Sequence, residues 1–134
     1  MSHRNRKARV DVTETELSVL KRLWDDGPST IRQLADRLYP GGEAAHYATV
    51  QKLLDRLQAK AWVGRQARGR VNVYTASLDR AALIALRLRE TAEQLCEGSV
   101  TPLLSQLVAS KEKLSPEEVT ALRELVDRLD DGSH

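Results

Sequence analysis

The sequence is poor in the residue types that carry most enzyme chemistry. It has one cysteine and three histidines in 134 residues. The single thiol, Cys96, excludes an intrachain disulfide and any metal site built from several thiolates. His3 and His134 lie at the ends of the chain, so only His46 remains as a base for a serine or cysteine nucleophile, and no histidine pair has metal-ligand spacing. We therefore expect no enzyme activity, no cofactor and no metal.

Long apolar runs and phenylalanine are also absent. No stretch of about 18 apolar residues occurs, which predicts no transmembrane helix and no membrane insertion. The basic N-terminus has no apolar segment behind it, so it is not a secretory signal. Aromatic residues make up only 4% of the chain, and the core must come from Leu, Val, Ile and Ala, which favours packed helices. These features predict a cytoplasmic, mainly α protein of one compact domain or two small units.

The charges are distributed unevenly, although the formal net charge is only +2. Residues 1–75 hold 14 Lys and Arg against 8 Asp and Glu, a balance of +6, whereas residues 76–134 hold 7 against 11, a balance of −4. A basic front and an acidic back are expected when only the front meets a polyanion. The alternative is chance segregation of solvated charges. Residues 1–10 are predicted to form a basic flexible arm.

Two helix starts are marked by capping boxes. Thr13 and Glu16 have the spacing in which a hydroxyl and a carboxylate each satisfy a free backbone N–H, and an apolar stripe follows them. Thr30 and Gln33 repeat the pattern at the second helix, which ends at residues 39–42, where Pro and Gly cannot continue it.

The third predicted helix, residues 46–60, has two distinct faces. Its apolar stripe has helical spacing and comprises Val50, Leu53, Leu54, Leu57 and Ala61. The opposite face holds small, hydrogen-bonding and cationic residues with one carboxylate: Ala48, Thr49, Gln51, Lys52, Asp55, Arg56 and Ala59. Such a helix is typical of a DNA-reading element.

A cationic hairpin is predicted directly after this helix. The turn falls at residues 67–70, where Gly69 is free to take a positive φ. Arg65, Arg68 and Arg70 lie near the tip, and no carboxylate occurs between Arg56 and Asp79. Three short helices followed by a hairpin predict a winged helix-turn-helix domain over residues 11–77.

The remaining residues, 78–131, predict a three-helix dimerisation region. Helices are expected over residues 79–96 and 102–110 and from Ser115 onward, where Ser caps, Pro takes the first position and Glu the third. The exposed leucine surface of so small a unit is a liability unless a second copy covers it. The alternative is packing back onto the winged domain of the same chain. The residues assigned to the homodimer interface are Leu83, Ile84, Leu88, Leu95, Leu103, Leu104, Leu107, Leu122, Leu125, Val126 and Leu129.

Four motifs in order resemble the penicillinase repressor family (BlaI/MecI/CopY). They are Thr13-Glu14-x-Glu16-Leu17 with Leu20 and Leu23-Trp24, then Thr49-Val50-x-x-Leu53-x-x-Arg56-Leu57, then Gly69-Arg70-x-x-x-Tyr74, then Leu114-Ser115-x-Glu117-Glu118. The resemblance implies a bacterial transcriptional repressor, a dimer with a winged-helix DNA-binding half and a three-helix dimerisation half. It implies that Trp24 and Tyr74 pack the winged core. It also implies that the residues touching the operator include Thr49, Gln51, Lys52 and Arg56.

The resemblance carries two further expectations about regulation. Members controlled by a membrane sensor-protease, a candidate partner, are commonly cut at an Asn-Phe bond after the first dimerisation helix. Residues 95–99 read Leu-Cys-Glu-Gly-Ser, so a cut here would need a different specificity. The copper-responsive branch has a cysteine-rich metal site, and this chain has none.

These observations predict a dimeric repressor that binds a pseudo-palindromic operator, with the third helix in the major groove and the basic hairpin on the backbone. Asp55 is expected to accept from a cytosine amino group or to pair with Lys52 or Arg56. An alternative is a winged-helix protein-interaction module without sequence-specific DNA binding; a small-molecule pocket is neither supported nor excluded. The residues assigned to DNA are Arg9, Thr30, His46, Tyr47, Ala48, Thr49, Gln51, Lys52, Arg56, Arg65, Arg68 and Arg70.

Overall fold

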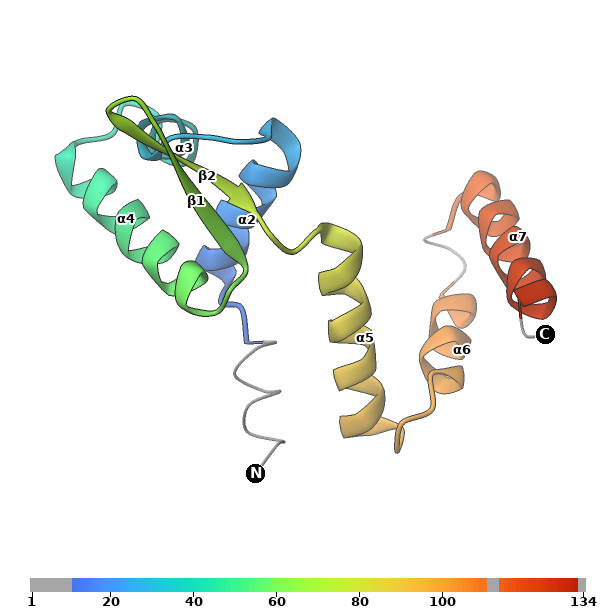
Figure 1. The fold of residues 1–134 in the computed structure, drawn as a ribbon. Helices are drawn as coiled ribbons and strands as arrows, with labels where there is room; N and C mark the ends of the chain where they lie inside the picture. Colours follow the sequence, from blue (N-terminus) through green and yellow to red (C-terminus); the bar gives the residue numbers. More distant parts are fainter. Residues whose placement is uncertain (1–10, 111–113, 133–134) are drawn as a thin grey trace. The chain divides into compact units, whose positions relative to one another are not determined.

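The computed structural model of the protein describes residues 11–110 and 114–132. The predicted basic arm therefore lies outside the described residues. The chain divides into two compact units, Met1–Arg87 and Leu88–His134. In chain order the elements are α2 (Glu14–Asp26), α3 (Ile31–Leu38), α4 (Ala44–Ala59), β1 (Val63–Arg68), β2 (Val71–Ala76), α5 (Arg80–Leu95), α6 (Thr101–Ala109) and α7 (Pro116–Gly132) (Figure 1).

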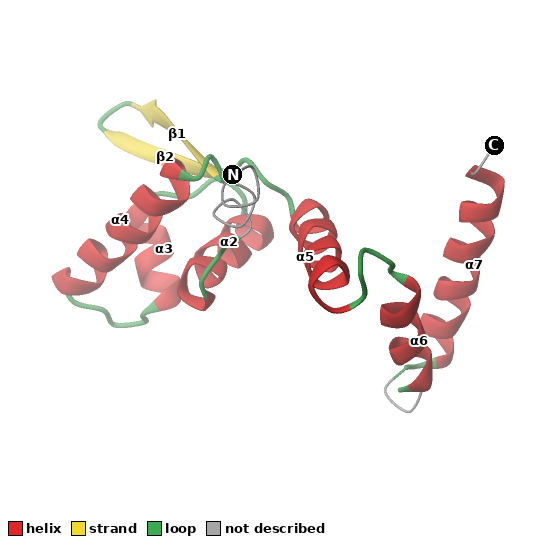
Figure 2. Ribbon diagram, turned by 90° about the horizontal axis from the view of Figure 1, so that it is seen from below, coloured by secondary structure: helices red, strands yellow, loops and turns green. Residues whose placement is uncertain are grey.

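Three helices followed by an antiparallel hairpin form a winged helix-turn-helix in the first unit, with further helices after it (Figure 2). This confirms the fold class predicted from the sequence. The prediction placed the end of the winged domain at residue 77, whereas the first unit runs to Arg87. The difference arises because Leu83, in the first turns of α5, is buried in the core of the winged domain.

The capping boxes set the starts of the helices as predicted. The Thr13 hydroxyl accepts from the N–H of Glu16 (3.1 Å), and the Glu16 carboxylate accepts from the N–H of Thr13 (2.9 Å). Thr30 and Gln33 exchange the same pair of bonds at α3, with distances of 3.1 and 2.9 Å. Each box satisfies two backbone donors that have no partner inside the helix, so these starts are fixed by local chemistry.

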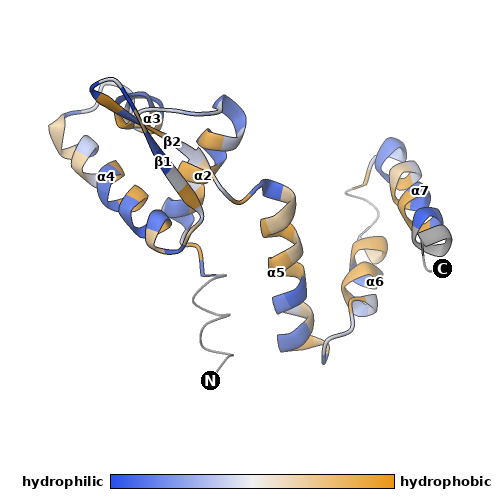
Figure 3. Cartoon of the chain, in the orientation of Figure 1, coloured by the Kyte–Doolittle hydropathy of each residue, from blue (hydrophilic) through white to orange (hydrophobic). Residues whose placement is uncertain are grey.

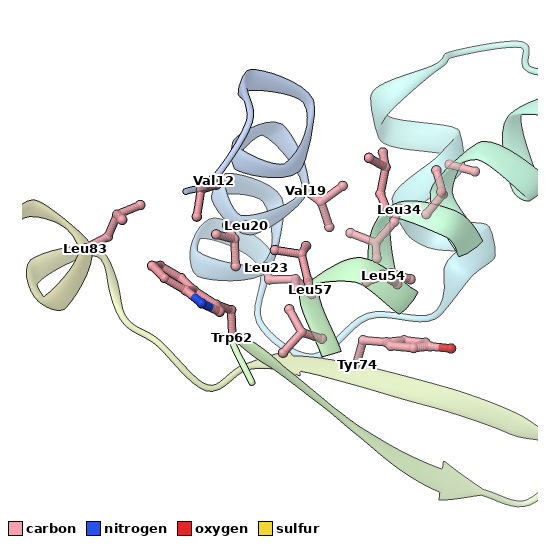
Figure 4. Packing of buried hydrophobic residues seen from close by; sticks show 14 residues of the cluster. Val12, Val19, Leu20, Leu23, Leu34, Leu54, Leu57, Trp62, Tyr74 and Leu83 are labelled. Carbon is pink, nitrogen blue, oxygen red and sulfur yellow. The ribbon is translucent and has the colours of Figure 1, made fainter. Parts of the chain in front are cut away.

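The core of the first unit joins all of its elements (Figure 4). Tyr74 is almost fully buried, and Trp24 packs against the cluster with its indole N–H donating to the Leu78 carbonyl (2.8 Å), as the family resemblance implied. Trp62, at the start of the wing, is buried as well, although the sequence patterns did not single it out. The buried cluster consists of Val12, Val19, Leu20, Leu23, Leu34, Ala35, Val50, Leu53, Leu54, Leu57, Trp62, Val63, Tyr74 and Leu83.

The end of α4 differs from the predicted helix. The sequence extended the apolar stripe to Ala61, but that residue is exposed and lies beyond the helix with φ of +63°. The N–H of Ala61 donates to the carbonyl of Gln58, and the N–H of Trp62 donates to the carbonyl of Leu57, both over 2.9 Å. This bond pair is a Schellman ending, in which the residue after the helix cap is left-handed. Ala61 therefore turns the chain into the wing.

The wing is a two-stranded hairpin with a two-residue loop. Arg68 pairs with Val71, which leaves Gly69 and Arg70 in the loop. Gly69 has φ of +63°, whereas Arg70 does not have a positive φ, a combination typical of a type II′ turn. The turn was predicted over residues 67–70, but Ala67 is paired in β1 and the turn spans residues 68–71. The positive φ expected at Gly69 is confirmed.

A third backbone segment joins the hairpin at one point. Ser29 is buried, and its N–H and carbonyl form hydrogen bonds of 3.0 and 2.8 Å with Tyr74. Its hydroxyl donates to the carbonyl of Gly27 (2.9 Å). This bridge anchors β2 to the segment between α2 and α3. A single bridging residue has no period, so sequence patterns could not reveal it.

The second unit leaves many apolar side chains uncovered. No residue of α6 is buried, and Figure 3 shows apolar residues along α5 and α6. Ten large apolar residues of the described chain are markedly exposed, and all but Val71 and Ile84 belong to the second unit: Val71, Ile84, Leu88, Leu95, Val100, Leu104, Leu107, Val108, Leu125 and Val126. Within the described ranges no helix has the length and apolar character needed to cross a bilayer.

Candidate nucleic-acid interface

The two faces of α4 are separated as the sequence predicted. Val50, Leu53, Leu54 and Leu57 are buried against the other elements of the first unit. The opposite face is solvent-accessible, with Gln51 half-buried and the others exposed: Ala48, Thr49, Gln51, Lys52, Asp55 and Arg56. The structure therefore brings most of the residues assigned to base reading onto one accessible helix face.

Two hydrogen bonds order this face. The Thr49 hydroxyl donates to the carbonyl of Ala45 (3.1 Å), one turn earlier in the helix. The Gln51 side-chain amide donates through Nε2 to the Asp55 carboxylate (3.0 Å). Asp55 was expected to pair with Lys52 or Arg56, or to meet a cytosine. No ion pair joins it to either cation in the described structure, and its partner within the chain is Gln51.

The turn that leads into α4 is tightly built. The sequence started this helix at residue 46, but it begins at Ala44, because the N–H of Glu43 donates to Nδ1 of His46 (3.1 Å) and caps the first turn. The His46 ring also stacks on Tyr39, with centroids 4.5 Å apart. A Cβ on Gly42 would come within 2.7 Å of both the Tyr39 carbonyl and the His46 ring, so the turn requires glycine there.

The first turn of α4 is also tied to α3. Tyr47 is half-buried, packs against the core, and its hydroxyl donates to the Asp36 carboxylate (3.3 Å). His46 and Tyr47, both assigned to DNA, therefore have structural partners that hold the N-terminus of α4. Thr30, assigned likewise, uses its hydroxyl to cap α3. Arg9 lies outside the described residues.

The wing arginines are exposed but do not form one cluster. Arg65 pairs opposite Tyr74 and Arg68 opposite Val71. Alternate residues of a strand face opposite sides, so Arg65 lies on the core-facing side of the hairpin and Arg68 on the other. Arg70 lies in the loop itself. The wing presents cations on both faces and at its tip.

Several arginines of the first unit are engaged by acidic partners. Asp25 and Asp26, at the end of α2, accept from arginines of three elements. Arg22 lies 3.2 Å from Asp25, Arg37 lies 2.9 Å from Asp26, and Arg80 lies 3.0 Å from Asp25. Arg80 also stacks over the Trp24 ring at 5.3 Å. These three arginines are neutralised by neighbours within the fold.

The cations of the candidate interface have no such partners. Neither α4's Lys52 and Arg56 nor the three wing arginines form an ion pair with another described residue. Arg32, exposed on the first turn of α3, is unpaired in the same sense, and the sequence patterns did not identify it. The one sequence feature that could have pointed to Arg32 is its position in the first turn after the N-cap Thr30. Unpaired cations on one domain are available for phosphates.

A buried carboxylate fixes the far end of α4. Glu16 is fully buried, and the Lys60 ammonium lies 2.9 and 3.1 Å from its two oxygens and 2.7 Å from the Asp11 carbonyl. Burial raises the pKa of Glu16, but the hydrogen bonds from the Thr13 N–H and Lys60 outweigh it. The net result is a pKa below the ordinary value of 4.5. This pair locks α4 to the start of α2.

The residues assigned to the dimer interface differ in exposure. Leu83 is buried in the winged core, so its side chain is not accessible to a partner. Leu103 and Leu122 are half-buried, and the side chain of Leu129 lies outside the described structure. The remaining seven are exposed: Ile84, Leu88, Leu95, Leu104, Leu107, Leu125 and Val126.

No three His, Cys, Asp or Glu side chains gather into a metal-binding group among residues 11–110 and 114–132. Cys96 is a free, half-buried thiol.

Comparison with known proteins gives a family match over most of the chain. Residues 12–128 match the model of the family described as penicillinase repressor. No curated protein matches the chain.

Solved structures that match the chain include two of MarR and one of ZitR. The oxidized form of MarR from E. coli is 19% identical, with 96% of this chain and 87% of that chain covered and a TM-score of 0.46. A cysteine-to-serine mutant of E. coli MarR complexed with operator DNA is 20% identical, with coverages of 96% and 86% and a TM-score of 0.45. A cysteine-to-serine mutant of Lactococcus lactis ZitR is 19% identical, with coverages of 92% and 77% and a TM-score of 0.43.

Proposed function

The chain belongs to the penicillinase repressor family, and on that premise we propose that it represses transcription as a homodimer bound to a pseudo-palindromic operator. The observation that carries the proposal is the accessible polar face of α4, accompanied by cations on α4 and the wing that no described acidic side chain neutralises.

The helix α4 is proposed to read bases. Its 16 residues span about 24 Å at 1.5 Å per residue, and the N-terminal half enters the major groove. Gln51 pairs with an adenine edge, and Ala48 or the Thr49 methyl group meets a thymine methyl. Lys52 and Arg56 lie one turn apart on the same accessible face and bind phosphates, which orients the helix.

The wing is proposed to bind DNA phosphates through its arginines and not to read the base sequence. Arg68 and Arg70 lie at the exposed end of the hairpin, and Arg65 lies farther down the strand on its other face. A hairpin that tracks the backbone beside a groove can use cations on both faces, because phosphates flank it on each side. Arg32, at the start of α3, adds a further phosphate contact.

The helices after the winged domain are proposed to form the dimer. Burying a Leu or Ile side chain is worth roughly 1.5–3 kcal/mol, and seven of the assigned interface residues are exposed. A patch of this kind is normally covered by a partner. Two-fold pairing sets the distance between two copies of α4 and therefore the spacing of two half-sites.

Binding to random-sequence duplex DNA over a salt series tests this function against the rival of a protein-interaction module. The full chain is titrated into labelled duplex by fluorescence anisotropy between about 50 and 200 mM salt. We expect the affinity to fall steeply, by roughly 10³-fold or more if six or more phosphates are contacted. Absence of binding at the lowest salt, or binding that salt does not weaken, would contradict the proposal.

A further inference from the structure

The one acidic residue on the accessible face of α4 lies where DNA is proposed to bind. Asp55 is exposed, so burial does not demand that its carboxylate be paired. It nevertheless accepts a 3.0 Å hydrogen bond from Nε2 of Gln51, one turn earlier in the helix. A carboxylate on this face repels phosphate and costs affinity. Its presence there calls for a compensating role.

We infer that Asp55 is a positioning residue that holds the amide of Gln51 in the orientation that accepts adenine and rejects guanine. The inference rests on the proposed function. Asp55 makes no base contact in this scheme and acts only through Gln51.

The chemistry follows from the donors and acceptors involved. An ionised carboxylate only accepts, so the amide must turn its NH₂ group toward Asp55 and its Oε1 away. One N–H of Gln51 is then occupied, while the second N–H and Oε1 remain for a base. Adenine offers an acceptor at N7 and a donor at N6, which match this pair.

Guanine offers two acceptors, N7 and O6, at the same edge. A fixed amide would place its Oε1 against the guanine O6, where two acceptors repel. An amide free to rotate could instead turn both N–H groups toward guanine. Without the hydrogen bond to Asp55, the Gln51 amide could bind either adenine or guanine. With it, Gln51 favours adenine over guanine. This hydrogen bond also orders Gln51 before binding, which lowers the entropy lost on complex formation.

Two substitutions separate the charge of Asp55 from its hydrogen bond. Asp55→Ala removes both the charge and the acceptor. Asp55→Asn removes the charge and keeps a side-chain oxygen that can accept from Gln51, but its N–H groups can also donate to Oε1 of Gln51, so it no longer excludes the flipped amide. Asp55 is exposed and alanine favours helix, so both variants are expected to fold, and their binding to random duplex reports on this directly.

The experiment uses full-length wild-type chain, Asp55→Ala, Asp55→Asn, Gln51→Ala and the Asp55→Ala/Gln51→Ala double variant. Binding sites are first selected by the wild-type chain from a library of random duplexes. The base pair whose preference disappears in Gln51→Ala is then changed from A·T to G·C, and affinities for the two duplexes are compared for every protein.

We expect the wild-type chain to prefer A·T at this position by roughly fivefold or more. Asp55→Ala is expected to reduce this ratio to about twofold or less while binding random duplex more tightly than wild type. Asp55→Asn should gain the same non-specific affinity and lose less of the preference than Asp55→Ala, because Asn can still accept from Gln51 but does not exclude the flipped amide. In the double variant the ratio should equal that of Gln51→Ala, since both changes act through one contact.

Three results would overturn the inference: an undiminished preference for A·T in Asp55→Ala, a greater loss of that preference in Asp55→Asn than in Asp55→Ala, or the loss in Asp55→Ala of a preference for cytosine at a different base pair. The last would mean that Asp55 reads a base itself. Failure of the proposed function looks different, because the wild-type chain would then enrich no sequence from the library.

Discussion

Glu16 and Lys60 illustrate how a local motif can acquire a second role in the fold. The sequence identified Glu16 as the acidic half of a capping box, and it is. The structure adds that the carboxylate is fully buried and meets a lysine 44 residues later. Breaking such a pair from one side leaves a buried charge without its partner, which is costly.

Replacing Lys60 with Met should lower the free energy of unfolding by about 3 kcal/mol at pH 7. The folded-state pKa of Glu16 lies below 4.5, so the stability that this carboxylate contributes is complete above that pH and is lost as pH falls through the folded value. Urea unfolding of wild type and Lys60→Met at neutral pH and at a pH about one unit below the ordinary glutamate value measures both effects.

The difference between the two proteins should shrink at the lower pH. Lys21→Met, which removes an exposed lysine of α2, serves as the control and should change stability by about 0.5 kcal/mol or less. A Lys60→Met deficit of the same size at both pH values would show that the ion pair is not its cause.

Ala61 has a backbone conformation that is unfavourable for a residue with a side chain. Its φ of +63° is costly for a residue with a side chain, by roughly 1–2 kcal/mol. Changing Ala61 to Gly removes that cost, and the greater freedom of glycine in the unfolded chain offsets about 0.4–1 kcal/mol of the gain.

We therefore expect Ala61→Gly to stabilise the protein by about 0.5–1 kcal/mol in urea unfolding. Ala48→Gly, at an exposed interior position of α4, should instead destabilise it by about 1 kcal/mol. If both substitutions changed stability in the same direction, Ala61 would not be strained in the way its backbone indicates.

At the scale of elements, local sequence chemistry predicted where helices begin better than where they end. Each capping box, at Thr13 and at Thr30, is recognisable from two residues three positions apart, and both helix starts are confirmed. The end of α4 is a Schellman ending with alanine in the left-handed position. Because glycine usually occupies that position, the sequence did not indicate the ending. The start of α4 shifted because His46, an unusual partner, caps it.

The features of the fold that could not be predicted from the sequence include contacts between residues far apart in the chain. The bridge between Ser29 and Tyr74 joins segments far apart in the chain, and a single pair leaves no periodic trace. The pairing of Asp55 with Gln51 was missed for another reason, because several polar neighbours on α4 offered equally plausible partners. The separation of Arg65 from Arg68 onto opposite faces required the strand register.

At the scale of elements, we predict that the wing contributes to the salt dependence of DNA binding. Replacing Arg68 and Arg70 with Ala should weaken binding to every duplex and lower the slope of log affinity against log salt by about 1.8, since each phosphate contact contributes about 0.9. The slope is measured by anisotropy with one fixed duplex.

Arg123→Ala with Arg128→Ala removes the same charge from exposed positions of α7 and should leave the slope unchanged. An unaltered slope in the wing variant would remove the hairpin from the interface. A loss confined to one DNA sequence would give it a reading role instead.

At the scale of the whole molecule, specificity requires two copies of α4. One helix reads only a few base pairs, so a repressor needs a second half-site to select its operator. The exposed apolar residues of α5, α6 and α7 form the surface that we propose for that pairing. The sequence predicted this surface from leucine content, and most of the assigned residues are exposed; Leu83 is buried instead because it lies in the winged core.

The chain should therefore sediment at twice its 15.0 kDa mass at micromolar concentration. Changing Leu125 and Val126 to Asp places charges in the proposed interface and should shift the protein to monomer. Val71→Asp alters an equally exposed apolar residue of the wing and should leave the dimer intact. A wild-type mass of 15.0 kDa throughout, or dissociation by the Val71 variant alone, would contradict the proposed interface.

The central claim is that two copies of α4 select one operator, and footprinting tests it most directly. Hydroxyl-radical footprinting of the DNA upstream of the protein's own gene, with excess random duplex as competitor, is the measurement. The account predicts two protected half-sites related by a pseudo-dyad, centred a whole number of helical turns apart. Protection of a single stretch without a dyad, or complete loss of protection to the random competitor, would contradict it.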